Sequence, residues 1–232
     1  MADDGNAWEL SDMRMRIKQL EHENAQLQQL LAQHVGRDVA HQALVSGSAI
    51  GGETRFVAVL FVDLVGSTSA VSTMRPAEVV AMLNTFFELV IRVVERHGGF
   101  VNKFVGDEAL VIFGAPAYRA DAATSALTAA RELVAELEAI PGIQVGIGVS
   151  AGTVLAGNIG SAERFEYTVI GDPVNEAARL TELAKKQPGS ILASSYAVDF
   201  SGDGEQALWE TGELVKLRGR NKLTRLAWPR AN

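Results

Sequence analysis

One apolar run limits the fold of this chain more than any other stretch. It extends from Phe56 to Val62 and ends directly on Asp63. A run that is apolar at every position, without polar alternation, is typical of a strand buried on both faces. We therefore predict that residues 55–62 form a central strand of a sheet and that this strand presents a carboxylate at its end.

A second carboxylate stands in a turn between two further strands. Residues 100–105 and 109–113 are predicted to form a hairpin around Gly106 and Asp107. An Asp in such a turn often serves only the turn itself. Here, however, Asp63 supplies a partner at another strand end. If the strands pair in one sheet, the two carboxylates converge on hard divalent cations, and Mg²⁺ is typically held by one or two carboxylates together with substrate phosphates.

The rest of the globular part alternates helices with strands. Glycine alternates with Ile and Val over 143–150, and strand glycines permit the close approach of another backbone. Residues 161–167 are polar and predict a loop. The order β-α-β-β-α-β, followed by an appended α/β portion, predicts an α+β, ferredoxin-like fold. The expected helices are 76–97, 120–140, 173–186 and 194–200, and the further strands are 143–150, a turn and strand over 151–160, 188–193, 208–215 and 223–228.

The N-terminal segment carries a heptad pattern. Seam positions spaced alternately three and four apart run from residue 10 to residue 34, with Asn24 at a buried a position. This pattern favours a parallel two-stranded coiled coil, and the alternative is an amphipathic helix packed on its own domain. Gly36 ends the pattern before a short helix and a Ser- and Gly-rich joint. The expected divisions are a coiled-coil helix at 1–35, a short helix and joint at 36–54, and a globular domain at 55–230.

Composition argues against several classes of protein. The 232 residues carry a formal net charge of -7 without a basic cluster, which disfavours binding to nucleic acid. There is no cysteine, hence no disulfide and no thiolate metal site. No apolar run reaches the ~18–20 residues of a membrane span, and no secretory signal is visible. We expect a cytoplasmic location, either as a free protein or as the cytoplasmic part of a larger membrane protein.

Three motifs in order resemble one family. They run from Phe61 to Thr68, from Lys103 to Glu108 and from Gly171 to Arg179. Together they are similar to the class III nucleotidyl cyclases, in the bacterial adenylate cyclase branch. The resemblance implies conversion of ATP to 3′,5′-cyclic AMP and pyrophosphate with two divalent cations, Mg²⁺ or Mn²⁺. It also implies a head-to-tail homodimer with two equivalent shared sites, which the coiled coil would hold together.

The resemblance assigns metal and base contacts to particular residues. Asp63 and Asp107 match the metal-binding aspartates, and the Leu64 carbonyl matches a further ligand. Lys103 matches the lysine that contacts a ring nitrogen of adenine. Thr168 falls where the family places an Asp or Thr that contacts the exocyclic amine. The guanylate cyclases of this family carry Glu and Cys at these two positions, so the resemblance implies that Lys103 and Thr168 favour ATP.

The resemblance also assigns ribose and phosphate contacts. Asn175 matches the residue that orients the ribose, and Arg179 matches the residue that stabilises the transition state. The resemblance implies that one subunit supplies the metal and base residues and that the partner subunit supplies Asn175 and Arg179. Arg220 is similar to a lysine that contacts the triphosphate. A small-residue turn, which is an ordinary turn on the simplest interpretation, has backbone N–H groups that could cradle phosphates; it comprises Gly66, Ser67 and Thr68.

Three other functions stay open. A diguanylate cyclase shares the fold but would carry a Gly-Gly-Asp/Glu-Glu-Phe turn, where this chain has the turn from Val105 to Ala109. A nucleotide-binding or dimerisation module without catalysis is the second, although every catalytic position is filled. A guanylate cyclase is the third, and Lys103 disfavours it. Turnover assays with ATP and with GTP distinguish these functions.

Overall fold

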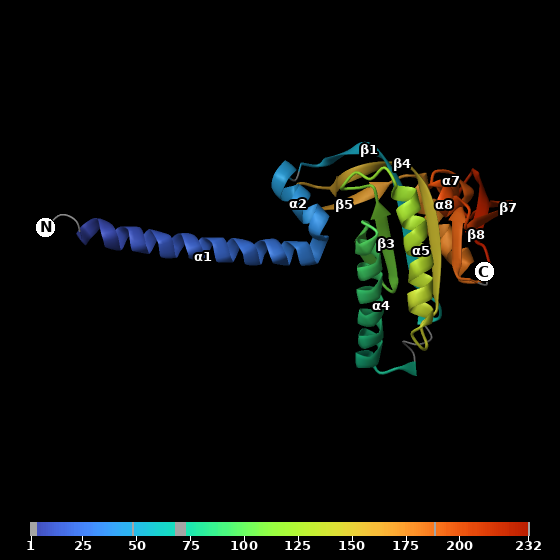
Figure 1. Ribbon diagram of the computed structural model, residues 1–232, viewed down its shortest axis with the longest axis horizontal. Coiled ribbons are helices and arrows are strands. Elements are labelled where there is room, and N and C mark those ends of the chain that lie inside the picture. Colours follow the sequence, from blue (N-terminus) through green and yellow to red (C-terminus); the bar gives the residue numbers. More distant parts are fainter. Residues whose placement is uncertain (1–3, 48, 68–72, 188, 232) are drawn as a thin grey trace. The chain divides into compact units, whose positions relative to one another are not determined.

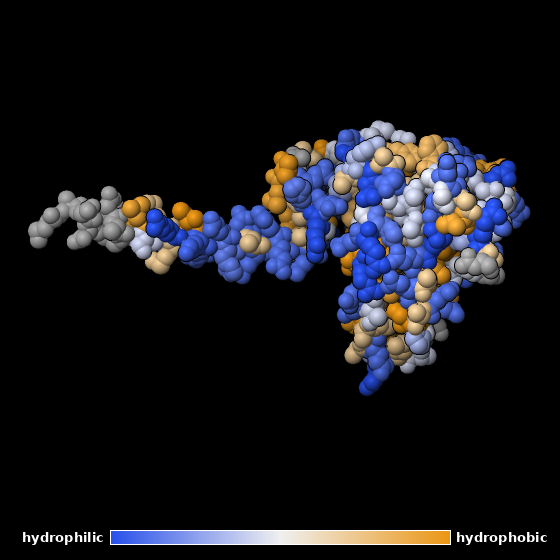
Figure 2. Space-filling model, viewed as in Figure 1, coloured by the Kyte–Doolittle hydropathy of each residue, from blue (hydrophilic) through white to orange (hydrophobic). Residues whose placement is uncertain are grey.

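The computed structural model describes residues 4–47, 49–67, 73–187 and 189–231, in two units, Met1–Ser48 and Ala49–Asn232. The first unit contains helices α1 (Asp4–Val35) and α2 (Arg37–Ser46). Figure 2 shows hydrophobic residues on the otherwise hydrophilic surface of α1, and Leu10, Ile17 and Leu27 of the heptad seam are exposed in the single chain. The helix is thus present, whereas its pairing into a coiled coil stays a prediction. Within the described residues, no helix combines the length and apolar character needed to cross a bilayer.

The second unit is built on one eight-stranded mixed sheet (Figure 1). The strand order is β2-β3-β1-β4-β6-β8-β7, with β5 paired to β4. Only β4 and β6 pair in parallel among the described strand pairs. The strands are β1 (Gly51–Leu64), β2 (Phe100–Val105), β3 (Glu108–Phe113), β4 (Val145–Gly160), β5 (Phe165–Ile170), β6 (Ile191–Ser194), β7 (Trp209–Lys216) and β8 (Leu223–Pro229).

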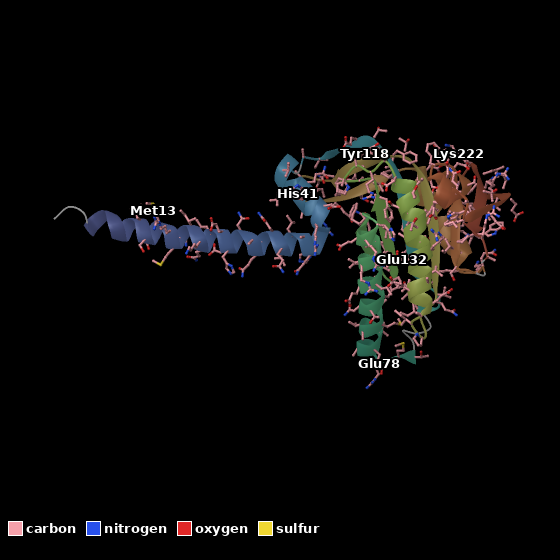
Figure 3. All side chains as sticks on the ribbon, viewed as in Figure 1. Met13, His41, Glu78, Tyr118, Glu132 and Lys222 are labelled. Atoms are coloured by element: carbon pink, nitrogen blue, oxygen red, sulfur yellow. The ribbon has the colours of Figure 1, made fainter. Side chains whose placement is uncertain are left out.

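Two long helices lie side by side along the sheet, α4 (Pro76–Arg96) and α5 (Ala122–Glu138) (Figure 1). Leu60 of β1, Phe86 of α4 and Leu133 of α5 belong to one buried core. Arg96 forms an ion pair with Glu132, and the ring of His97 contacts the same carboxylate; Figure 3 shows Glu132 on the side of α5 that faces α4. The order β1-α4-β2-β3-α5-β4 confirms the α+β, ferredoxin-like prediction. Helices α6 (Asp172–Ala184), α7 (Ser195–Asp199) and α8 (Asp203–Gln206) belong to the appended portion.

Helix α6 packs on β4 where that strand has glycines. A Cβ at Gly148 would lie 2.2 Å from the Ala177 carbonyl oxygen and 2.4 Å from the Thr181 nitrogen. A Cβ at Gly146 would lie 2.9 Å from the Thr181 carbonyl oxygen. Real Cβ atoms essentially never come within 3.0 Å of such atoms, so the glycines allow the helix backbone to approach. This confirms the close approach predicted from the glycine alternation, and it fixes α6 against the sheet.

Several expected boundaries differ from the structure. β1 begins at Gly51 because residues 51–55 continue the ladder with β4. Residues 145–160 form one uninterrupted strand in place of the expected strand, turn and strand. β5 begins at Phe165, within the expected loop, because its polar residues pair with the end of β4. Short helix α8 was not expected, since four residues are too few for a recognisable period.

Candidate active site

Strands β1 and β3 bring the two aspartates to one end of the sheet. Asp63 is the partner of Glu108 in the β1–β3 ladder. Asp107 comes directly before Glu108, in the two-residue turn that joins β2 to β3. Gly106 opens this turn with a φ of 66°, a left-handed conformation that glycine adopts without strain. Leu64 is buried at the end of β1. The structure thus gathers Asp63, Leu64 and Asp107, and their role as metal ligands stays a prediction.

Negative charge is concentrated at this strand end. Burial raises the pKa of Asp63, the ammonium of Lys185 opposes that rise, and the neighbouring Asp107 adds to it. Burial, together with the negative charges of Asp63 and Asp107, raises the pKa of Glu108 to about 7. The Lys185 ammonium forms an ion pair with the Asp63 carboxylate. One ammonium therefore partly neutralises a group of three carboxyl groups.

The donor set at this end fits a divalent cation that is completed by its substrate. Among the described residues, no group of three or more His, Cys, Asp and Glu side chains forms a ready metal cage. Mg²⁺ is commonly bound by one or two carboxylates plus phosphate oxygens and water. Asp63 and Asp107 supply such a pair, and each already bears the repulsion that a cation would relieve. The residues present therefore fit the expected metal ions.

The two residues expected to read the base meet where β2 approaches β5. Lys103 of β2 places its Nζ 2.6 Å from Oε2 of Glu166 on β5. Thr168 of β5 donates from Oγ1 to Oδ1 of Asn102 at 3.1 Å. Lys103 and Thr168 are both half-buried. Two cross-links between the same strands therefore hold a cationic donor and a hydroxyl in one region.

Helix α6 carries the two remaining catalytic candidates away from the aspartates. Asn175 is exposed, and Arg179 forms an ion pair with Glu182 one turn along. Lys185, which contacts Asp63, follows Arg179 by about 9 Å and Asn175 by about 15 Å of helix rise. No described hydrogen bond or ion pair joins Asn175 or Arg179 to Asp63 or Asp107. One chain alone does not gather these residues around the strand-end carboxylates.

Arg220 has surroundings unlike those of a free phosphate contact. Its side chain is buried, and its Nε and Nη2 donate to the two Asp172 oxygens at 2.9 and 2.7 Å. Its Nη1 contacts Glu176 and Thr224. These hydrogen bonds occupy the Arg220 guanidinium donors with acceptors of the same chain. These bonds would have to break before Arg220 could reach a triphosphate, and the expected contact between Arg220 and the triphosphate stays a prediction.

The expected phosphate turn is described only in part. Gly66 has a φ of 75°, and a Cβ there would meet no atom of the described residues within 4 Å. Ser67 is the last described residue before a gap and has helical backbone geometry. Thr68 lies outside the described residues. The sequence interpretation missed Lys185 and Asn102, which contact Asp63 and Thr168 respectively. Their partners come from other strands and helices, and neither residue belongs to a recognisable spacing.

A family model described as the adenylate and guanylate cyclase catalytic domain matches residues 52–227. This chain belongs to that family. The chain is 53% identical over 208 residues to the uncharacterized protein Rv1318c of Mycobacterium tuberculosis, over 89% of this chain and 38% of that protein. It is 49% identical to Rv1319c of the same organism, over 89% of this chain and 39% of that protein. The chain thus spans about two-fifths of the length of these curated relatives.

Solved structures with the same fold include cyclases of both base types. The guanylyl cyclase Cya2 is 31% identical with a TM-score of 0.66, over 77% of this chain and 93% of that one. A bacterial light-regulated adenylyl cyclase is 21% identical with a TM-score of 0.79, over 94% of this chain and 64% of that one. The adenylyl cyclase CyaB from P. aeruginosa is 20% identical with a TM-score of 0.71, over 79% and 97%. The family is therefore established, and its solved members act on either base.

Proposed function

We propose that this cyclase domain converts ATP to 3′,5′-cyclic AMP and pyrophosphate. The observation that carries the proposal is the pair of Lys103 and Thr168, held by cross-links between β2 and β5. Adenine presents an acceptor at N1 and a donor at its amine, whereas guanine presents a donor at N1 and an acceptor at O6. A lysine ammonium only donates, so Lys103 complements adenine N1 and opposes the N1–H of guanine.

In the proposed reaction, the ribose 3′-oxygen attacks the α-phosphorus of the same ATP molecule. The new bond joins O3′ to the α-phosphorus, the bond to the pyrophosphate oxygen breaks, and the hydroxyl proton passes to water or substrate phosphate. Positioning and charge stabilisation carry such a reaction, because little covalent chemistry falls to the protein. Arg179 would direct its planar guanidinium at the charge on the α-phosphate, which a lysine could not match in geometry. Asn175 would orient the ribose.

The metal ions belong with the strand-end residues. Asp63, Asp107 and the Leu64 carbonyl would hold two divalent cations, Mg²⁺ or Mn²⁺. When bound, these ions would supply positive charge to the 3′-hydroxyl and to the leaving pyrophosphate. Gly66, Ser67 and Thr68 would add backbone N–H groups to the phosphates. Arg220 would contact the triphosphate only after its guanidinium releases Asp172 and Glu176.

The proposed site is shared between two copies of the chain in a head-to-tail homodimer. One copy would supply Lys103, Thr168 and the aspartates, and its partner would supply Asn175 and Arg179. The position of Arg179 on α6, about 9 Å of helix rise before the residue that contacts Asp63, supports this division. The exposed heptad seam of α1 supports a parallel coiled coil that joins the copies. Deletion of residues 1–45 should then make activity fall steeply with dilution, and activity that does not depend on concentration would contradict this role.

Turnover measurements test the proposed function directly. Wild type should form cyclic AMP with Mn²⁺ or Mg²⁺ and turn over GTP poorly. Arg179→Ala should lower the rate by about 10²-fold or more, because an electrostatic contact to the transition state is lost. Arg75→Ala is the matched control, since Arg75 forms the same i,i+3 ion pair with Glu78 on an exposed helix start. That variant should keep wild-type activity.

Mixing two inactive variants tests the shared site. Asp107→Ala and Arg179→Ala should each be nearly inactive alone. Their mixture should regain part of the activity, because a mixed dimer restores one intact site. The same total protein of each variant alone is the control. No recovery in a mixture that still forms dimers would contradict the shared arrangement, and turnover of GTP in preference to ATP would contradict the proposed substrate.

A further inference from the structure

Asn102 lies where β2 departs from regular pairing. The register between β2 and β3 shifts between Val101 and Lys103, so Asn102 falls at the irregularity. Such bulges redirect a side chain and are frequent beside active sites. The half-buried Asn102 side chain makes two hydrogen bonds, and both partners lie on β5, more than sixty residues away in the chain. The bulge therefore directs Asn102 at the strand that carries Thr168.

The two hydrogen bonds fix which way the Asn102 amide points. Its Nδ2 donates to the Tyr167 carbonyl oxygen at 2.6 Å. A carbonyl oxygen can only accept, so the amide nitrogen must face Tyr167 and the amide oxygen must face Thr168. The amide oxygen can also only accept. The Thr168 hydroxyl, 3.1 Å away, is therefore the donor in the second bond.

This chain of bonds gives the Thr168 hydroxyl a fixed polarity. A hydroxyl has one proton and two acceptor lone pairs. The proton of Thr168 is directed to Asn102, and the lone pairs remain. Toward any other group, Thr168 is therefore an acceptor. Without Asn102, the same hydroxyl could rotate and donate.

We propose that Asn102 is a specificity-determining positioning residue, which holds Thr168 as an acceptor so that the site takes a base with an amino group. This inference rests on the proposed function, in which Thr168 faces the exocyclic position of the base. An acceptor at that place bonds the adenine amine and opposes the guanine O6. Lys103 would donate to the ring nitrogen of adenine. Asn102 would hold the Thr168 hydroxyl as an acceptor for the exocyclic amine without itself contacting the base.

A merely structural role for Asn102 makes a different prediction. If the amide only ties β2 to β5, its removal should loosen the site for both nucleotides, and the kcat/KM values for ATP and GTP should fall together. If it sets the polarity of Thr168, the ratio of the two values should change. The ratio is therefore the measurement that separates the roles.

The experiment compares kcat/KM for ATP and GTP in the full chain and in variants of Asn102 and Thr168. Asn102→Ala and the near-isosteric Asn102→Leu both release the Thr168 hydroxyl; whichever keeps the wild-type circular dichroism spectrum is scored. The ATP-to-GTP ratio should fall about three- to tenfold, the value of one neutral hydrogen bond. Asn102→Asp keeps an acceptor for Thr168 but loses the donor to Tyr167, so it should keep the ratio while melting at a lower temperature.

Two further variants complete the test. In a Thr168→Val background the Asn102 substitutions should no longer change the ratio, because the hydroxyl is gone. Asn158→Ala is the matched control. Asn158 lies on β4, the strand paired with β5, and its amide donates to the Ala49 carbonyl, so its removal should leave the ratio unchanged. An unchanged ratio in folded Asn102→Ala or Asn102→Leu would overturn the inference about Asn102 but not the proposed function. A wild type that prefers GTP would instead overturn the proposed function.

Discussion

The close packing of α6 on β4 makes Gly148→Ala a demanding test of the structure. The new Cβ would lie 2.2 Å from the Ala177 carbonyl oxygen, 2.4 Å from the Thr181 nitrogen and 2.5 Å from Thr181 Oγ1. Two of these three atoms are backbone atoms of the helix, so no side-chain rotation relieves the contact. Restoring even a tight separation of 3.0 Å requires α6 to move away from the sheet by about 1 Å, and such a displacement in an overpacked core lowers stability.

The expected effect appears in both stability and activity. Overpacking of a well-packed core typically costs about 1–3 kcal/mol, so the free energy of unfolding in urea should fall by that amount. Helix α6 carries Asn175 and Arg179, and a displacement of about 1 Å can lower a rate by about 10²-fold. Cyclic AMP formation should therefore fall more than the remaining folded fraction explains.

Gly204→Ala is the matched control for this substitution. Gly204 lies in α8, and a Cβ there would meet no atom within 4 Å. Alanine is a better helix former by up to about 1 kcal/mol, so this variant should be at least as stable as wild type and fully active. A Gly148→Ala protein with wild-type stability and activity would refute the reasoning, because α6 could then not lie as close to β4 as described.

Three further predictions concern the charged groups. Arg220→Ala should lower the free energy of unfolding by about 3 kcal/mol, because it leaves the buried Glu176 carboxylate without its cationic partner. Replacement of the exposed Arg218 by Ala should not lower it, and a raised KM with unchanged stability in Arg220→Ala would instead place Arg220 on the triphosphate. The pKa of Glu108 is about 7 in the folded protein and lower in the unfolded chain. The protonated Glu108 therefore contributes fully to the free energy of unfolding below about pH 4.5, and this contribution is lost as the pH rises through 7. Metal-free protein should thus lose about 1–2 kcal/mol over that range, after allowance for partial exposure, and Glu108→Gln should flatten the urea-unfolding profile; an unchanged slope would contradict the assignment. Lys185→Met keeps the aliphatic stem but removes the ammonium from Asp63, so Mn²⁺ should bind about two- to fivefold tighter by calorimetry, whereas weaker binding would show that Lys185 does not compete with the ion.

The sequence was most informative where a pattern is local. The apolar run before Asp63, the turn at Asp107 and the alternation that includes Gly148 each predicted a feature that the structure contains, because each depends on neighbouring residues. The strand at 165–170 was missed because its polar residues pair with the end of β4. A short, polar edge segment has no apolar alternation from which such a pairing could be predicted.

Long-range pairing explains the other differences at the site. Lys185 meets Asp63 across more than a hundred residues, and Arg220 meets Asp172 across forty-eight. Asn102 reaches Thr168 only because β2 shifts its register. Such contacts depend on how distant strands and helices align in space. The motifs therefore predicted which residues belong to the site, but not the distant residues that set the charge and orientation of those side chains.

The length of β1 limits how a displacement at its start could reach the carboxylate at its other end. This strand begins at Gly51, just after the joint between the two units, and ends with Asp63 and Leu64. Its ladder to β4 is unbroken over all fourteen residues, a span of about 45 Å. A slip of one residue would turn every side chain, including that of Asp63, to the opposite face. A force on the start of β1 can therefore tilt or twist the strand as a rigid lever, but it cannot slide the carboxylate gradually along the sheet.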